Sequence, residues 1–460
     1  MEADVTTSGT GETGGGRLLL DCTRTALHGG QTGVQRVVRN LVAELCGGRF
    51  TDYLRSSQGP LLDPRDFGFE AIVPVAWDGA HFRKLSGRGS PTLAEVLPLQ
   101  PRPWVRRLRR LSNMREARVV SPDGDAAQRP RPNVHSTLSP RLERILGLAF
   151  AWRRKVVPAA ADTLLLLDPP WNSATLAGAV TALPCRVGTL FHDVVPMTHP
   201  ETCSAGVPAQ FRRFLGEACR FSDFVVTVSH ATAENLRDIA GRTPGLIPSL
   251  PSLHPFPLAT TLHLEGSEDT DFLGHARLRE IMAGPPMCIA VGTIEPRKNH
   301  HLLLDGFERL WAADTDVNLL VIGRVGWSEP ELLDRLNRHP ERSRRLYVMH
   351  NLSDDGLRYA YRYAAALVAP AASEGFGLPL LEARAFGCPV IASDIPPHRE
   401  AGGSSAAFFE PGDAAALAAA VQGVLGLGGT GPVGPNKAVD RDVPDWRAAA
   451  ATLLREISTG

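Results

Sequence analysis

A chain of 460 residues is too long for one ordinary domain and fits two domains of roughly 150–250 residues each. It carries 49 Lys and Arg against 49 Asp and Glu, so its net charge gives no sign of nucleic acid or an acidic substrate as a partner. The seven cysteines are scattered and form no CxxC pair, which argues against a disulfide framework or a zinc knuckle and favours a reducing, cytoplasmic setting.

The N-terminal 1–16 segment is rich in Gly, Thr and Glu, and we expect it to be disordered. It has no basic start and no apolar core, so it does not look like a signal peptide, and no window of about 20 apolar residues predicts a membrane span. The apolar run 18–20 predicts a short buried strand, and a glycine loop leads from it to a helical pattern at 34–42. Strand, glycine loop and helix in this order open a Rossmann-like unit.

The rest of the first half continues this pattern after an interruption. Further strands are predicted at 71–75, 163–167, 187–191 and 224–228. Residues 101–155 hold many arginines, few acidic residues and a middle rich in Pro and Gly, which indicates a basic insertion. The proline-rich run 244–257 is predicted to be an extended linker. We therefore predict a first Rossmann-like domain over 17–268.

The second half alternates strands and helices of regular length. Strands are predicted at 288–291, 317–322, 346–348, 366–368 and 389–391, and helices at 302–311, 329–336 and 355–363. This alternation favours a parallel sheet covered on both faces. We predict an α/β fold class with a second Rossmann-like domain over 285–433, followed by a last helix within 439–458.

Two glutamates flank a glycine-containing loop and the start of a predicted helix. Glu374 lies in the loop, Pro379 suits the first helical position, and Glu382 is placed in the first helical turn. The loop between them consists of Gly375, Phe376 and Gly377. The unpaired amides of such a helix start suit a phosphate, and the two carboxylates would face the crevice where an open parallel sheet binds ligands. The simpler alternative is an ordinary helix start with a cap and a surface glutamate.

A second segment places two cations after a strand. Gly292 follows the strand at 288–291 and allows a close backbone approach, and Arg297 and Lys298 lie at the start of the next helix. Two cations and a helix N-terminus suit a diphosphate. Lys298 is one of four lysines in a chain that otherwise uses arginine. The alternative is a solvated Arg-Lys pair.

Together these segments resemble the retaining glycosyltransferase family 4, the group 1 glycosyltransferases. The stretch 288–413 fits best, and 32–36, 191–196 and 226–229 match more loosely. The sequence Glu-Pro-Arg-Lys-Asn at 295–299 is similar to the corresponding motif in the branch of the family that includes mannosyl- and rhamnosyltransferases. The resemblance implies a GT-B fold, in which two Rossmann-like domains face each other across a cleft and the C-terminal helix crosses back to the first domain. An ordinary terminal helix of the second domain remains an alternative.

The resemblance also implies roles for individual residues. Glu374 would contact the donor sugar on its reacting face, Glu382 would bind the ribose, and Lys298, helped by Arg297, would hold the diphosphate. Many members carry Gly-Arg where this chain has Gly292-Thr293, so Arg297 is expected to replace the missing arginine.

In the first domain, the resemblance implies that His192 faces the donor sugar at the end of a strand; a strand-end histidine satisfied by backbone is the alternative. Gly33, with Gly30, would let the first loop approach the phosphate or the acceptor. A simple turn explains these glycines equally well.

These expectations define a retaining transfer of a hexose or deoxyhexose from a nucleotide sugar, with a GDP-mannose-like donor favoured. The acceptor would be a hydroxyl of a glycan, a lipid-linked molecule or a small molecule. No DxD motif follows a strand, and no His or Cys cluster has ligand spacing, so we expect no metal and no cofactor. A sugar-nucleotide epimerase of similar shape and a non-catalytic nucleotide-sugar-binding protein remain alternatives. No GxGxxG follows the first strand, which disfavours a Rossmann oxidoreductase.

The basic insertion carries one further hypothesis. The segment 104–111 sets apolar residues at helical spacing among arginines, a pattern that suits an anionic membrane surface. Peripheral contact with the inner face of the membrane would bring the protein to a lipid-linked acceptor. The alternative is a solvated basic helix packed on its own domain.

Overall fold

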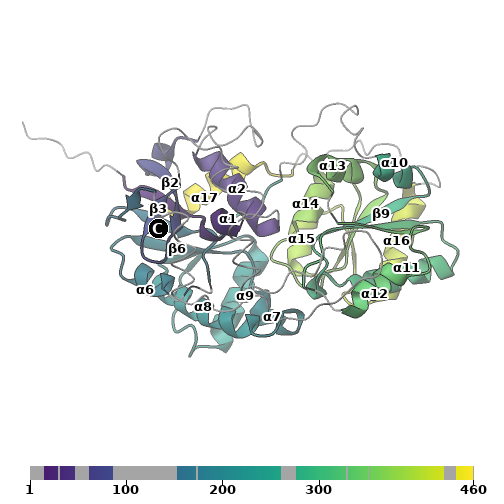
Figure 1. Cartoon of the computed structure of the whole chain (residues 1–460), viewed down its shortest axis with the longest axis horizontal. Helices are drawn as coiled ribbons and strands as arrows, with labels where there is room; N and C mark the ends of the chain where they lie inside the picture. Colours follow the sequence, from purple (N-terminus) through teal and green to yellow (C-terminus); the bar gives the residue numbers. More distant parts are fainter. Residues whose placement is uncertain are drawn as a thin grey trace, which may run out of the picture.

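Two α/β domains lie next to each other in the computed structural model (Figure 1). The structure describes residues 15–28, 32–46, 62–85, 153–171, 173, 175–260, 276–327, 330–350, 352–428 and 442–458. Nearly all of the basic insertion predicted at 101–155, its helix at 104–111 and almost the whole N-terminal segment lie outside these residues.

The first domain is built on a sheet whose described strands run in the order β4-β3-β2-β1-β5-β6-β7-β8. Its strands are β1 (Arg17–Asp21), β2 (Ala71–Trp77), β3 (Phe82–Lys84), β4 (Lys155–Val156), β5 (Thr163–Leu166), β6 (Arg186–Phe191), β7 (Phe224–Thr227) and β8 (Ser252–Pro255). Strands β3 and β4 pair antiparallel at one edge, and the others are parallel.

The expectation of an extended linker at 244–257 is wrong in part, because β8 occupies four of its residues. β8 pairs with β7 and lies at the edge of the sheet, with Pro255 opposite Thr227. An edge strand needs hydrogen-bond donors on one side only, so a proline is tolerated there.

Helices pack on both faces of this sheet, and the longer ones do so through an apolar stripe. In α2, for example, Val37, Val38, Leu41, Val42 and Leu45 are buried. The helical elements are α1 (Thr23–His28), α2 (Gly33–Cys46), η2 (Pro64–Phe67), α6 (Leu176–Thr181), α7 (Val195–Thr198), η3 (Pro200–Thr202), α8 (Val207–Phe221) and α9 (His230–Arg242).

The second domain has a parallel sheet in the order β11-β10-β9-β12-β13-β14. Its strands are β9 (Met287–Val291), β10 (Asn318–Ile322), β11 (Leu346–Met349), β12 (Ala366–Ala369), β13 (Val390–Ser393) and β14 (Ala407–Phe409). Its helices are α10 (Ala276–Met282), η5 (Pro296–Lys298), α11 (His300–Ala312), α12 (Pro330–Arg338), α13 (Asp354–Tyr363), α14 (Leu378–Ala385), α15 (Pro396–Gly402) and α16 (Ala414–Gly428).

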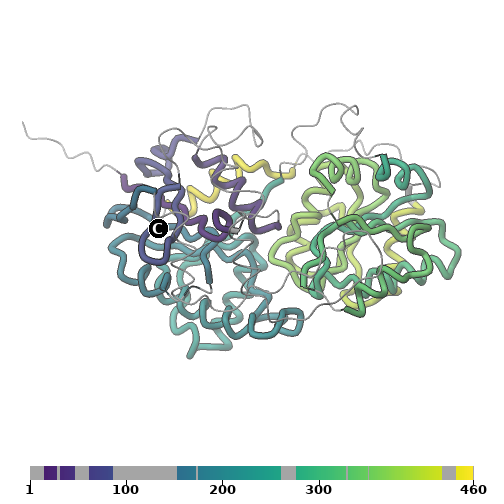
Figure 2. Tube along the Cα trace, in the orientation of Figure 1, coloured from purple at the N-terminus to yellow at the C-terminus, as the bar shows by residue number. Residues whose placement is uncertain are grey.

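The last helix, α17 (Trp446–Ser458), returns to the first domain, where its yellow tube lies beside the purple one in Figure 2. It packs against α2, and the Ile457 carbonyl accepts a 2.6 Å hydrogen bond from Arg186 Nη1. The apolar stripe of α17 is buried, including Trp446 at 1% exposure. The chain therefore crosses between the domains twice.

The strand orders define where a ligand can lie. The chain changes direction across the sheet between β1 and β5 in the first domain and between β9 and β12 in the second. Loops that leave neighbouring strands at such a switch point diverge and leave a crevice at the carboxyl ends of the strands. The loops with Gly292 and Glu374 follow β9 and β12 and therefore border this crevice.

Candidate active site

A cavity of about 920 Å³ lies between the two domains. It is lined by every residue that the sequence proposed for the site and that the structure describes: Gly33, His192, Gly292, Arg297, Lys298, Glu374, Gly375, Phe376, Gly377 and Glu382. Gly30, the other glycine of the first loop, lies outside the described residues. The structure thus brings the proposed residues of both halves to one place.

The loop after β9 folds back so that Lys298 lies against Gly292. Gly292 has a φ of 150°, and a Cβ atom there would lie 3.4 Å from Lys298 Cε. Lys298 ends the short turn η5, and Asn299, at φ 53°, begins α11 as its cap. Arg297 and Lys298 therefore precede the helix instead of starting it. The contact distance is ordinary, so it is the positive φ of this position that favours glycine.

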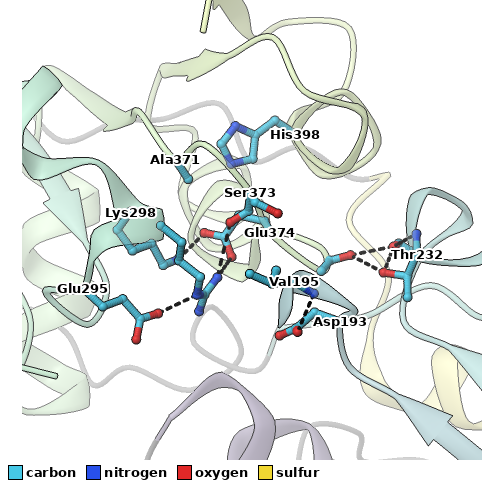
Figure 3. A network of polar contacts seen from close by, with 12 residues as sticks. Asp193, Val195, Thr232, Glu295, Lys298, Ala371, Ser373, Glu374 and His398 are labelled. Atoms are coloured by element: carbon cyan, nitrogen blue, oxygen red, sulfur yellow. Dashed lines mark hydrogen bonds and ion pairs between the residues drawn. The ribbon is translucent and has the colours of Figure 1, made fainter. Parts of the chain in front are cut away.

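Glu374 is held by both cations of this loop (Figure 3). Its Oε2 accepts a 2.6 Å bond from Arg297 Nη1, and its Oε1 bonds to Lys298 Nζ. Burial alone would raise the pKa of Glu374, but the Lys298 and Arg297 charges lower it to about 2. Glu374 is therefore an ionised, oriented carboxylate at neutral pH.

Arg297 also bonds to Glu295, with Nε 2.6 Å from Oε1. Burial would lower the pKa of Arg297, and the charges of Glu374, Glu295 and Asp193 raise it. Arg297 thus compensates carboxylates of its own site, which gives little support to its expected role as a substitute phosphate arginine. Lys298 bonds to Glu374 through one of the three donors of an ammonium group, which leaves capacity for a phosphate.

The Gly375-Phe376-Gly377 loop passes close to the backbone of the first domain. A Cβ on Gly375 would lie 1.9 Å from the His192 carbonyl oxygen, and Gly377 has a φ of 110°. Phe376 is buried in the core at 7% exposure. Gly377 is the cap of α14, which begins at Leu378, so Glu382 falls in the second helical turn and not in the first.

Glu382 is 5% exposed, and both of its oxygens have protein partners. Oε1 accepts a 2.9 Å bond from Arg36 Nη1, and Oε2 accepts a 2.8 Å bond from the Tyr361 hydroxyl. Burial raises the pKa of Glu382, and the Arg36 charge counteracts this shift. A ribose would therefore have to compete with Arg36 and Tyr361 for this carboxylate.

His192 and Gly33 line the cavity from the first domain. His192 Nε2 lies 2.8 Å from the Leu167 carbonyl oxygen, so it carries a proton and leaves Nδ1 as an acceptor. Burial lowers the pKa of His192, which keeps the ring neutral at pH 7. The backbone contact proposed as the alternative is thus present, on one ring nitrogen. A Cβ on Gly33 would lie 3.6 Å from Leu378, an ordinary contact, so sterics do not require glycine there.

The sequence did not predict a role for several residues of the site. Arg36 lies in the matched stretch 32–36 but had no assigned role, and Tyr361 is one of several tyrosines on α13. Asp168 follows β5, lines the cavity and accepts a 2.7 Å bond from the Thr25 hydroxyl. Trp171 also lines the cavity, with the Arg24 guanidinium 5.6 Å from its ring centroid.

The described residues contain no group of three or more His, Cys, Asp or Glu arranged to hold a metal ion. In the same part of the chain, every helix is too short or too polar to cross a membrane.

A comparison with family models matches residues 279–428 to the model described as "Glycosyl transferases group 1". Among curated relatives, the serotype-specific mannosyltransferase WbdA of Escherichia coli is 33% identical over 243 residues, or 51% of this chain and 29% of that protein. O-antigen chain mannosyltransferase B of Escherichia coli is 27% identical over 51% of this chain and 60% of its own length. The chain thus spans about a third to three fifths of these relatives.

Two solved proteins similar to this chain cover nearly all of it. HepE of Anabaena, solved in complex with UDP-glucose, matches 96% of this chain and 94% of its own with a TM-score of 0.53 and 14% identity. The sucrose-phosphate synthase of Thermosynechococcus elongatus matches the same shares with a TM-score of 0.52 and 17% identity. These similarities establish the GT-B fold.

Proposed function

We propose that this chain, which carries a group 1 glycosyltransferase domain in a GT-B fold, transfers a hexose from a nucleoside diphosphate sugar to an acceptor hydroxyl. One observation carries the proposal: an ionised glutamate, a lysine and a helix start meet at the rim of the second sheet, inside the interdomain cavity. GDP-mannose is the favoured donor, because the similar curated proteins include several mannosyltransferases.

The difficult step is departure of the diphosphate, on which negative charge grows. Lys298 and the positive end of α14 at Leu378 would stabilise that charge without having to reorganise. The positive charge that grows on the sugar ring would be stabilised by the Glu374 carboxylate, which stays ionised at neutral pH. Glu374 also fixes Lys298, so one ion pair orders the groups for both charges.

We further propose that transfer retains the anomeric configuration. The bond from the anomeric carbon to the diphosphate breaks, and its electron pair leaves with the diphosphate. The acceptor oxygen attacks on the face just vacated, and its proton passes to the departing phosphate oxygen. His192 would border the donor sugar from the first domain, because its Nε2 bonds to the Leu167 carbonyl and leaves Nδ1 to accept a hydrogen bond from a sugar hydroxyl. NMR of the product would report the anomeric configuration.

A thermal-shift panel of GDP, UDP, dTDP and their sugar conjugates tests the donor. The proposal expects the largest stabilisation with GDP and GDP-mannose, and release of GDP when GDP-mannose is incubated with the protein. A larger shift with UDP or dTDP would contradict the favoured donor. Interconversion of sugars without an acceptor would favour an epimerase, and binding without turnover would favour a binding protein.

The proposed acceptor hydroxyl belongs to one of three classes of molecule: a glycan, a lipid-linked molecule or a small molecule. Peripheral membrane contact at the cytoplasmic face rests on the sequence of the 104–111 segment. Liposome binding that is lost when Arg106, Arg107, Arg109 and Arg110 become Glu would support it, and unchanged binding would contradict it.

A further inference from the structure

The first domain holds the Glu374 loop at the next residue, Gly375. The Gly375 carbonyl oxygen accepts a 2.5 Å hydrogen bond from the Ser229 hydroxyl and a 3.1 Å bond from the Thr232 hydroxyl. These two side chains are almost completely buried, at 0% and 1% exposure. The bonds therefore fix the backbone directly beside the carboxylate that binds Lys298. In Figure 3, Thr232 and Lys298 lie on opposite sides of Glu374.

The two hydroxyls are themselves rigidly held by the start of α9. Ser229 is the cap of this helix, and its Oγ accepts a 2.9 Å bond from the Thr232 amide. A hydroxyl can accept in this way and still donate its single proton elsewhere. The Ser229 carbonyl oxygen in turn accepts a 2.9 Å bond from the Thr227 hydroxyl. The donors that hold Gly375 are thus fixed by the helix start.

The second domain makes a return contact to the same helix. The Glu400 carboxylate on α15 accepts bonds from the first amides of α9, at 3.0 Å from His230 N and 3.3 Å from Ala231 N. A negative charge is favourable at a helix N-terminus, where these amides have no partner within the helix. Helices α9 and α15 also pack against each other. Contacts therefore run in both directions between the domains at this point.

We propose that this interdomain clasp, formed by Ser229, Thr232, Gly375 and Glu400, positions Glu374 for turnover. The inference rests on the proposed transfer reaction and adds positioning residues to it. When the clasp is closed, the Glu374 loop is fixed from both domains; when it is open, the loop is held only by the second domain. Docking of the domains thereby sets the geometry of the carboxylate. A displacement of about 1 Å at a reacting group can reduce turnover by roughly 100-fold.

A matched pair of substitutions at Thr232 tests the clasp. Thr232→Val keeps the shape but removes the hydroxyl, whereas Thr232→Ser keeps the hydroxyl. With GDP-mannose as the probe and GDP release as the readout, Thr232→Val should lower kcat by roughly 10- to 100-fold. The KM for GDP-mannose should change by less than about threefold, because the donor is held mainly by the second domain. Thr232→Ser should be close to wild type.

Glu400→Gln provides a second variant on a partly exposed side chain, where misfolding is not expected. It should lower kcat less strongly than Thr232→Val does, because the glutamine oxygen can still accept a hydrogen bond from one amide of α9. Hydrogen exchange of residues 372–379 gives a readout without substrate and should be faster in Thr232→Val than in Thr232→Ser.

The outcomes separate the clasp from the proposed function. Wild-type kcat and unchanged exchange in folded Thr232→Val would overturn the clasp, even where Glu374→Gln abolishes turnover. An equal loss of kcat in Thr232→Val and Thr232→Ser would also overturn the clasp, because the hydroxyl would then be irrelevant. Turnover that survives Glu374→Gln would instead overturn the proposed function.

Discussion

The Arg36 guanidinium of the first domain and the Glu382 carboxylate of the second form an ion pair across the cavity, with 2.9 Å between Nη1 and Oε1. Arg36 Nη2 also bonds to Asp354, at 2.9 Å. Burial would lower the pKa of Arg36, but the charges of Glu382 and Asp354 raise it. The carboxylate proposed to bind the ribose therefore already bridges the two domains.

Removal of this cation should affect nucleotide binding. We expect Arg36→Gln to tighten GDP binding by roughly 5- to 10-fold, or about 1–1.4 kcal/mol, because the ribose hydroxyls would no longer compete with a charged partner. Isothermal titration calorimetry measures the change. Arg242→Gln, on an exposed arginine of α9, serves as the matched control.

A double-mutant cycle shows whether the effect acts through Glu382. In a Glu382→Gln background, Arg36→Gln should leave GDP affinity nearly unchanged. Weaker GDP binding by Arg36→Gln in the wild-type background would contradict the competition and would make Arg36 a contact for the nucleotide itself.

Lys298 should be essential for departure of the diphosphate. Lys298→Gln should lower kcat for GDP-mannose by roughly 100- to 1,000-fold, the usual cost of removing one preorganised charge-stabilising donor. Lys298→Arg should not restore it, because a planar guanidinium does not reproduce the compact ammonium group that bonds to Glu374 Oε1. Steady-state kinetics beside the exposed control Lys155→Gln measures this, and full activity of Lys298→Arg would argue against this requirement for an ammonium group.

The sequence predicts most strands of both sheets because buried parallel strands consist of continuous runs of apolar residues. β10, for example, is buried along its whole length. The short antiparallel strands β3 and β4 were not predicted, since three or two residues show no periodicity. β8 was predicted as linker because prolines are typical of extended segments as well as of edge strands.

The sequence predicts the parts of the site that depend on local structure, but not the contacts that depend on how the two domains dock. Gly292, Lys298 and Glu374 lie in loops that directly follow strands, so their meeting at one edge of a sheet follows from the strand pattern. The Arg36–Glu382 pair joins residues 346 positions apart and depends on how the domains dock. Ser229 lies in the loosely matched stretch 226–229, but its bond to Gly375 likewise depends on that docking and does not follow from the local sequence.

Asp21 should make the stability of the first domain depend on pH. Its side chain is fully buried, and this burial raises the pKa of Asp21 to about 8. The folded state thus binds a proton that the unfolded state releases near pH 4, so the contribution of Asp21 to stability is fully present below that pH and is lost as pH rises towards 8. The slope is at most about 1.4 kcal/mol per pH unit.

Asp21→Asn should remove this dependence, since the amide does not titrate. In thermal melts between pH 4 and pH 8, the Tm of the variant minus the Tm of the wild type should rise with pH and be largest near pH 8, because the other titrating groups affect both proteins equally. Parallel curves for the two proteins would show that Asp21 is ionised in the fold. Asp238→Asn, on an exposed side chain, is the control.

Turnover should not require a divalent metal, because Lys298 and the positive N-terminal end of α14 supply the stabilisation of the leaving group in the proposed reaction. GDP release from GDP-mannose should be unchanged by excess EDTA and by added Mg²⁺ or Mn²⁺. A loss of activity with EDTA that Mn²⁺ restores would contradict this expectation.

The most direct measurement compares GDP release from GDP-mannose by the wild type and by Glu374→Gln, with Glu410→Gln as an exposed control. We predict steady release by the wild type and the control, and a loss of roughly 1,000-fold or more in Glu374→Gln, whose GDP affinity stays within about 10-fold. Equal rates in the folded Glu374→Gln protein and the wild type, or no turnover of any nucleotide sugar by the wild type, would contradict the central claim.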